Sequence, residues 1–137
     1  GGKVIGLEME QSAVEMARSN ARLNGLEDYA RFEVADLYDR GGQNATVHDQ
    51  LAEVMQENPT SILLDPPRSG AGPHLASICK KESIERIVYV SCNPETFASD
   101  GAILVESGFR LKRVGAFDMF PNTSHLETLG VFVKERP

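Results

Sequence analysis

Three short segments of this sequence carry side chains that could act together in catalysis. Cys92 lies two residues after an apolar run at residues 88–90, and Asp65 follows a second apolar run. Glu127 lies two residues after His125, so both side chains share a face if this stretch is extended. A thiolate is a strong nucleophile and a positioned carboxylate can act as a general base. These residue types indicate covalent catalysis by Cys92, with Glu127 as a candidate base.

The spacing around Cys92 leaves other interpretations open. A buried structural role is the more frequent outcome for a free cysteine at a strand end, because free cysteine behaves as a small hydrophobe. We assign that structural role to Cys79, which falls within an expected helix. No pair of cysteines has metal-ligand spacing. A cysteine hydrolase is disfavoured because no histidine lies locally where it could activate Cys92.

Carboxylates also follow three expected strands. The two prolines in Asp65-Pro66-Pro67-Arg68 restrict the backbone and remove two donors, so this loop should present Asp65 in one direction. Glu8 and Asp36 end two earlier strands. Open α/β sheets bind ligands at the carboxyl ends of their strands, and an acid there can accept hydrogen bonds from ribose hydroxyls. An ordinary strand-end or turn role is the alternative for each residue.

Apolar runs alternate with helix-like stretches, which is typical of a doubly wound parallel sheet covered by helices. The pattern predicts one α/β domain over residues 1–137, with a polar loop at 39–44. We expect strands at 4–8, 32–34, 62–64 and 86–91, helices at 12–23, 48–57, 75–81 and 95–107, and an antiparallel pair at 110–117 and 128–134.

The overall composition excludes some classes of protein and makes others less expected. Of the 137 residues, 41% are hydrophobic and 25% are charged, which suits a globular domain. No apolar run approaches the roughly 18 residues of a membrane span, so we expect a cytoplasmic protein without a membrane partner. The net charge is −6, whereas a free-standing nucleic-acid binder is usually basic.

Three motifs occur in the order found in a known family. They are DPPR at residues 65–68, VYVSCNP at 88–94 and DMFPNTSHLE at 118–127. Together they resemble the S-adenosylmethionine (SAM) dependent RNA uracil-5-methyltransferases. The resemblance implies a class I methyltransferase fold, with Cys92 as the nucleophile and Glu127 as the base that removes the C5 proton. It also implies SAM as cofactor, with Glu8 at the ribose, Asp36 at the adenine and Asp65 between SAM and the uracil.

The resemblance covers only the later part of the family's catalytic domain. The family's first strand and the Gly-rich turn after it have no counterpart in these residues. The sequence therefore reads as a C-terminal part of that domain. We expect this piece to bind SAM weakly or not at all and to be inactive alone. A second copy of the chain could cover the exposed sheet and form a homodimer.

The function implied for the parent protein is methylation of a uridine C5 in RNA. The motifs slightly favour 23S ribosomal RNA, and transfer RNA is the alternative. Because this segment is acidic, the RNA should be gripped mainly by upstream segments. A non-catalytic α/β module with a vestigial SAM site is the alternative from a different class.

Overall fold

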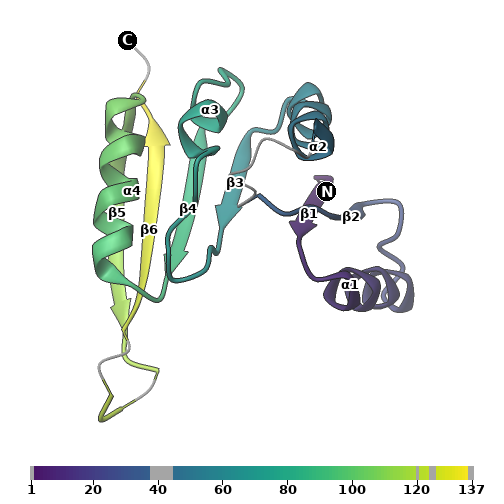
Figure 1. Ribbon diagram of the computed structural model, residues 1–137, viewed down its shortest axis with the longest axis horizontal. Helices are drawn as coiled ribbons and strands as arrows, with labels where there is room; N and C mark the ends of the chain where they lie inside the picture. Colours follow the sequence, from purple (N-terminus) through teal and green to yellow (C-terminus); the bar gives the residue numbers. More distant parts are fainter. Residues whose placement is uncertain (1, 38–44, 120, 124–125, 136–137) are drawn as a thin grey trace. The chain divides into compact units, whose positions relative to one another are not determined.

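The computed structural model describes residues 2–37, 45–119, 121–123 and 126–135. The chain forms two compact units, Gly1–Val54 and Met55–Pro137 (Figure 1). Within the described ranges, no helix has the length and apolar character needed to cross a membrane.

The first unit is a β-α-β arrangement followed by most of a second helix. Strand β1 (Val4–Glu8) pairs in parallel with β2 (Ala30–Val34), and helix α1 (Gln11–Leu23) connects them. The helix buries Val14 and Ala21 and ends at Asn24-Gly25, where Gly25 adopts a φ of 63°. Glycine tolerates this left-handed conformation, which explains why the helix ends there. Helix α2 (Ala45–Gln56) follows β2.

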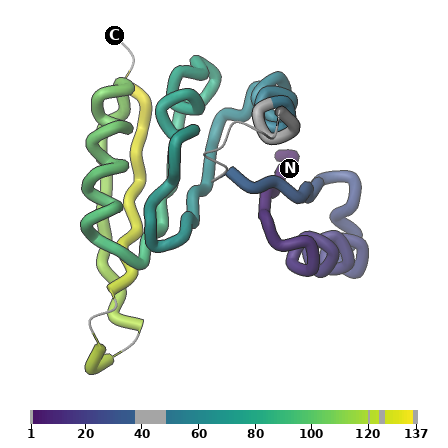
Figure 2. Tube along the Cα trace, viewed as in Figure 1, coloured from purple at the N-terminus to yellow at the C-terminus, as the bar shows by residue number. Residues whose placement is uncertain are grey.

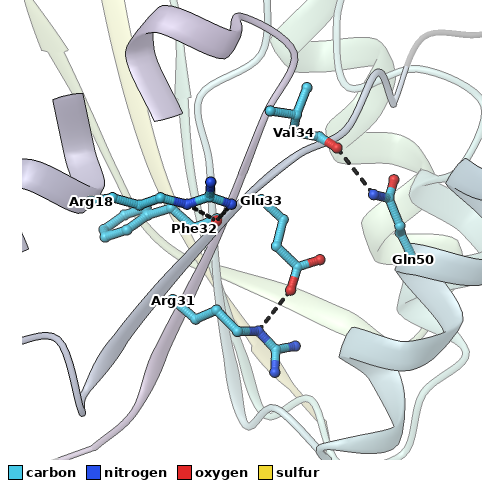
Figure 3. Close-up of polar contacts among 6 residues, drawn as sticks. All are labelled: Arg18, Arg31, Phe32, Glu33, Val34 and Gln50. Atoms are coloured by element: carbon cyan, nitrogen blue, oxygen red, sulfur yellow. Dashed lines mark hydrogen bonds and ion pairs between the residues drawn. The ribbon is translucent and has the colours of Figure 1, made fainter. Parts of the chain in front are cut away.

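Side chains from both helices hold β2 in place (Figure 3). The Arg18 guanidinium donates two hydrogen bonds to the Phe32 carbonyl oxygen, at 2.9 Å from Nε and 2.6 Å from Nη2. The Gln50 side chain donates to the Val34 carbonyl oxygen at 3.1 Å. Carbonyls of alternate strand residues point to the same side, so these contacts satisfy one edge of β2. They fix the strand end that leads into Asp36.

The second unit is a four-stranded sheet with two helices. Its strands are β3 (Ser61–Leu64), β4 (Arg86–Ser91), β5 (Phe109–Phe117) and β6 (Glu127–Lys134), in the spatial order β3-β4-β6-β5. The β3–β4 pair is parallel, and the other two pairs are antiparallel. Helix α4 (Pro94–Glu106) packs against β4, β5, β6 and the short helix α3 (Leu75–Cys79). Figure 2 traces the path of the chain through these elements.

An aromatic cluster forms the core between α4 and this sheet. The Tyr89 and Phe97 rings meet edge to face with centroids 5.5 Å apart, and Phe97 and Phe132 lie 6.1 Å apart. Tyr89 and Phe132 are almost fully buried. Gly130 leaves room for these rings: a Cβ there would lie 2.6 Å from Cζ of Phe97. The missing side chain therefore lets the helix approach β6 closely.

Most of the elements expected from the sequence are confirmed. Strands 4–8 and 86–91 have the predicted bounds, and the final antiparallel pair is longer by one residue, at Phe109 and at Glu127. The second strand begins at Ala30 because that residue pairs with Val4. The expected helix 75–81 ends at Cys79, since the next amides bond three residues back rather than four. The loop predicted at 39–44 lies outside the described residues.

We expect Gly130→Ala to lower the free energy of unfolding by about 1–3 kcal/mol, because the new methyl group overlaps Phe97. Gly101→Ala is the matched control within the same core. Its Cβ would meet Cζ of Phe132 at an ordinary 3.5 Å, and alanine favours the helix by up to about 1 kcal/mol. Thermal unfolding followed by circular dichroism should show opposite shifts for the two variants; equal shifts would contradict this packing.

Candidate functional site

One edge of the four-stranded sheet gathers the chemically capable residues of the second unit. Asp65 follows Leu64 at the carboxyl end of β3, and Cys92 follows Ser91 at the carboxyl end of β4. Because β3 and β4 are parallel, these two ends lie at the same edge. Strand β6 runs the opposite way and begins there, with Glu127.

The register of β4 and β6 places the expected nucleophile and base close together. The last pair of this antiparallel ladder joins Ser91 to Thr128, and both side chains are buried. Cys92 and Glu127 are the next residues beyond this pair along their own chains. Paired residues of antiparallel strands have Cα atoms about 4.5–5.5 Å apart, so the segments that carry Cys92 and Glu127 leave this pair at the same end of the sheet. Both are only half-buried, which leaves them accessible to a substrate.

The Asp65 loop is a defined turn that is tied to the start of α4. The Gly70 amide donates to the Pro67 carbonyl oxygen at 3.0 Å, which closes the turn. The Asn93 side-chain amide donates to the Arg68 carbonyl oxygen at 3.2 Å. Asp65 itself is exposed at the sheet edge. This hydrogen-bonded turn is consistent with the expectation that the loop presents Asp65 in one direction.

Cys92 lies immediately before the first turn of α4. Asn93 caps the helix by accepting a hydrogen bond from the Glu95 amide at 3.1 Å, and Pro94 occupies the first turn. The Ser91 hydroxyl accepts from the Asn93 amide at 3.1 Å and fixes the bend between strand and helix. The partial positive charge of a helix N-terminus favours an anion nearby. Cys92 thus lies two residues before the first residue of α4.

The two cysteines lie in different environments. Cys79 is 1% exposed, and burial raises the pKa of its thiol, although a hydrogen bond from Ser107 and the charge of Lys134 oppose that effect. Cys92 is half-buried at the sheet edge. Cys79 therefore fits the structural role assigned from the sequence, whereas Cys92 stays open to reagents and substrates.

Glu8 and Asp36 lie together at the carboxyl edge of the two-stranded sheet. The Ala35 amide donates to the Glu8 backbone carbonyl at 2.9 Å, so Asp36 leaves β2 directly beside the end of β1. One Glu8 carboxylate oxygen accepts from the Glu10 amide at 2.9 Å. Both acidic residues are exposed. This pair of acceptors suits the hydroxyls of a ribose and the amino group of an adenine.

The expected site residues thus fall into two sets, one in each unit. Glu8 and Asp36 belong to the first set, and the second set comprises Asp65, Cys92 and Glu127. His125, expected beside Glu127, lies outside the described residues. No group of three or more His, Cys, Asp or Glu side chains in the described part of the chain could hold a metal ion.

Comparison with known proteins assigns the family. Residues 2–136 match the model of the tRNA (uracil-5-)-methyltransferase family. The chain belongs to this family. The resemblance drawn from the three sequence motifs is therefore confirmed.

Relatives in the family act on different RNAs according to their names. A 23S rRNA (uracil(1939)-C(5))-methyltransferase of Xylella fastidiosa is 48% identical over 132 residues, which cover 96% of this chain and 28% of that enzyme. The crystal structure of the Pyrococcus abyssi tRNA (uracil-54, C5)-methyltransferase in complex with S-adenosylhomocysteine is 35% identical, with a TM-score of 0.71. It covers 97% of this chain and 29% of that protein. The chain thus spans less than a third of the length of these relatives.

More distant structures share the fold alone. M. capricolum TrmK, bound to S-adenosylhomocysteine, is 12% identical and has a TM-score of 0.59 over 98% of this chain and 52% of that one. Together with the Pyrococcus structure it confirms the Rossmann-like α/β class expected from the sequence.

Asn93 and Thr96 are site residues that the sequence analysis did not select. Both donate to the Arg68 carbonyl oxygen, Thr96 at 3.4 Å, and so join the Asp65 loop to α4. The order Asn93-Pro94-Glu95 is a helix N-terminus signal, and it could have identified the cap. The link to Arg68 spans 25 residues and has no local signal.

We expect a maleimide reagent to label Cys92 well before Cys79, since Cys79 is almost fully buried and burial raises the pKa of its thiol. Peptide mapping by mass spectrometry after timed labelling measures the two rates separately. Cys79→Ser should leave the Cys92 rate unchanged. Faster labelling of Cys79 in the folded protein would contradict the assigned roles.

Proposed function

We propose that the full-length protein carrying this chain methylates C5 of a uridine in RNA through a covalent adduct at Cys92. The observation that supports the proposal is the β4–β6 register, whose last pair is flanked by the half-buried thiol of Cys92 after β4 and by Glu127 at the start of β6. Family membership supports the same reaction class.

The chemistry requires a nucleophile because C5 of uracil is too weakly nucleophilic to take a methyl group by itself. Attack of the Cys92 thiolate at C6 forms a carbon–sulfur bond and makes C5 an enolate carbon. SAM, when bound, supplies the methyl group. Cys92 lies just before the N-terminus of α4, which carries a partial positive charge.

Glu127 completes the reaction as the general base. After methylation C5 carries both the new methyl group and its original proton. Removal of that proton by the Glu127 carboxylate restores the double bond between C5 and C6 as the carbon–sulfur bond breaks. The pyrimidine leaves as 5-methyluridine, and Cys92 returns to its thiolate form.

The residues of the first unit fit the nucleoside part of SAM. Glu8 and Asp36 present exposed carboxylates at the ends of two paired parallel strands, where hydroxyl and amino donors can be bound. We assign the ribose to Glu8 and the adenine to Asp36. Asp65 is assigned to the boundary between SAM and uracil. We further propose that the segment alone binds SAM weakly and is inactive.

Charge and similarity support the proposal for the RNA partner. An acidic segment with a net charge of −6 gains little from phosphate contacts, so the grip on RNA is assigned to other parts of the protein. We favour 23S ribosomal RNA over transfer RNA, because the Xylella rRNA enzyme is 48% identical and the Pyrococcus tRNA enzyme 35%.

We expect RNA that contains 5-fluorouridine to form a covalent adduct with the full-length protein in the presence of SAM. Fluorine cannot leave as a proton, so the reaction stops after methyl transfer with Cys92 still attached. Denaturing gels and mass spectrometry detect the adduct on 23S rRNA fragments and on tRNA transcripts tested in parallel. Cys92→Ala should abolish it, while the matched variant Cys79→Ala should keep it.

The RNA that forms the adduct faster identifies the substrate class. An adduct that persists in Cys92→Ala would refute Cys92 as the nucleophile. If neither RNA reacts although the protein is folded, the proposal fails and the non-catalytic α/β module takes its place.

We expect Glu127→Gln to trap an adduct on ordinary uridine RNA. The amide cannot accept the C5 proton, so methyl transfer proceeds but release does not, and turnover falls at least about a hundredfold. The adduct should be heavier than protein plus RNA by one CH2, because a methyl group is gained and the thiol proton is lost. Rapid turnover with no accumulated adduct would assign the base to another residue.

A further inference from the structure

Asp100 makes a set of contacts that the proposed reaction does not use. It lies in the middle of α4 and is partly buried. One of its carboxylate oxygens, Oδ2, accepts hydrogen bonds from the Ala71 amide at 2.7 Å and from the Tyr89 hydroxyl. Hydrogen bonds to an ionised acceptor are among the stronger kind. The carboxylate thus connects the chain just after the Asp65 loop with the centre of β4.

The backbone around Ala71 is shaped to approach this carboxylate. Gly70 is buried and has a φ of 94°, a backbone conformation that residues other than glycine rarely adopt. A Cβ at Gly70 would lie 2.7 Å from Oδ2 of Asp100. Glycine therefore meets two requirements at once, the left-handed turn and the close contact with Asp100.

The contacts to the loop come from one face of α4. Asn93, Thr96 and Asp100 are spaced three and four residues apart, which places them along one side of the helix. Asn93 and Thr96 bind the Arg68 carbonyl oxygen, while Asp100 binds the Ala71 amide. The chain is thus bound to α4 both within the turn, at Arg68, and just after it, at Ala71.

We propose that Asp100 is a positioning residue that locks the Asp65 loop to the helix beginning beside Cys92. Pro66 and Pro67 restrict the backbone between Asp65 and the turn, so a shift of the turn is transmitted to Asp65. These contacts keep the Asp65 carboxylate and the Cys92 thiol in a fixed relative position. This inference rests on the proposed function, because that position matters only if both groups face one substrate.

Two variants separate the lock from general stability. Asp100→Ala removes the acceptor, whereas Asp100→Asn keeps an oxygen that can accept both hydrogen bonds. Ser99→Ala is the matched control, because it changes an exposed neighbour on the same helix. All variants are made in the full-length protein.

The kinetic measurement follows formation of the 5-fluorouridine RNA adduct in the presence of SAM. Its amplitude reports the fraction of competent molecules, and its rate constant reports how well the groups are placed. We expect Asp100→Ala to keep the wild-type amplitude but to slow the rate constant about tenfold to a hundredfold, as a misplaced catalytic group does. Asp100→Asn should recover most of the rate.

Hydrogen–deuterium exchange tests the lock without any reaction. We expect the Ala71 amide to exchange about tenfold faster in Asp100→Ala than in wild type, with the β6 amides unchanged. A lower adduct amplitude with an unchanged rate constant, or unchanged exchange at Ala71, would overturn the inference. If the wild-type protein forms no adduct, the proposed function fails separately, and exchange at Ala71 alone decides whether Asp100 holds the loop.

Discussion

The pairing of β4 with a parallel strand on one side and an antiparallel strand on the other is the constraint on which the candidate site depends. Parallel pairing with β3 brings Asp65 to the edge where Cys92 leaves β4. Antiparallel pairing with β6 starts that strand at the same edge and supplies Glu127. A register shift of one residue would turn the side chains of β6 to the opposite face. The buried Ser91–Thr128 pair at the end of the ladder marks this register.

Packing and site geometry are coupled through α4. Its first turn is capped by Asn93 beside the thiol, and its middle carries Asp100, which binds the loop after β3. Phe97, on the same helix, packs with Tyr89 and Phe132 over Gly130. The helix is thus held by the aromatic core while it holds the loop, so the rigidity of the core extends to the polar edge.

The two units share one structural arrangement, although the residues that it presents differ. In each, polar residues lie at or just after the carboxyl ends of two parallel strands, so they gather at one edge. The first unit presents Glu8 and Asp36, which suit a nucleoside. The second presents Asp65, the thiol of Cys92 and the carboxylate of Glu127, which we propose act on a pyrimidine ring. The acidity of the segment is consistent with binding small polar groups rather than a phosphate backbone.

The sequence by itself determined the residue types, the family and most of the elements. Apolar alternation and turn residues act locally, so strand 86–91 and the final hairpin were predictable, as was the helix start after Asn93-Pro94. The end of α3 at Cys79 was less predictable, because the amides that follow it bond to carbonyls three residues back rather than four. Only the tertiary structure decided that the end of β4 next to Cys92 pairs with the start of β6 next to Glu127, and that Asp100 binds Ala71. Those contacts arise from strand register and helix packing, which depend on the whole chain rather than on any local pattern.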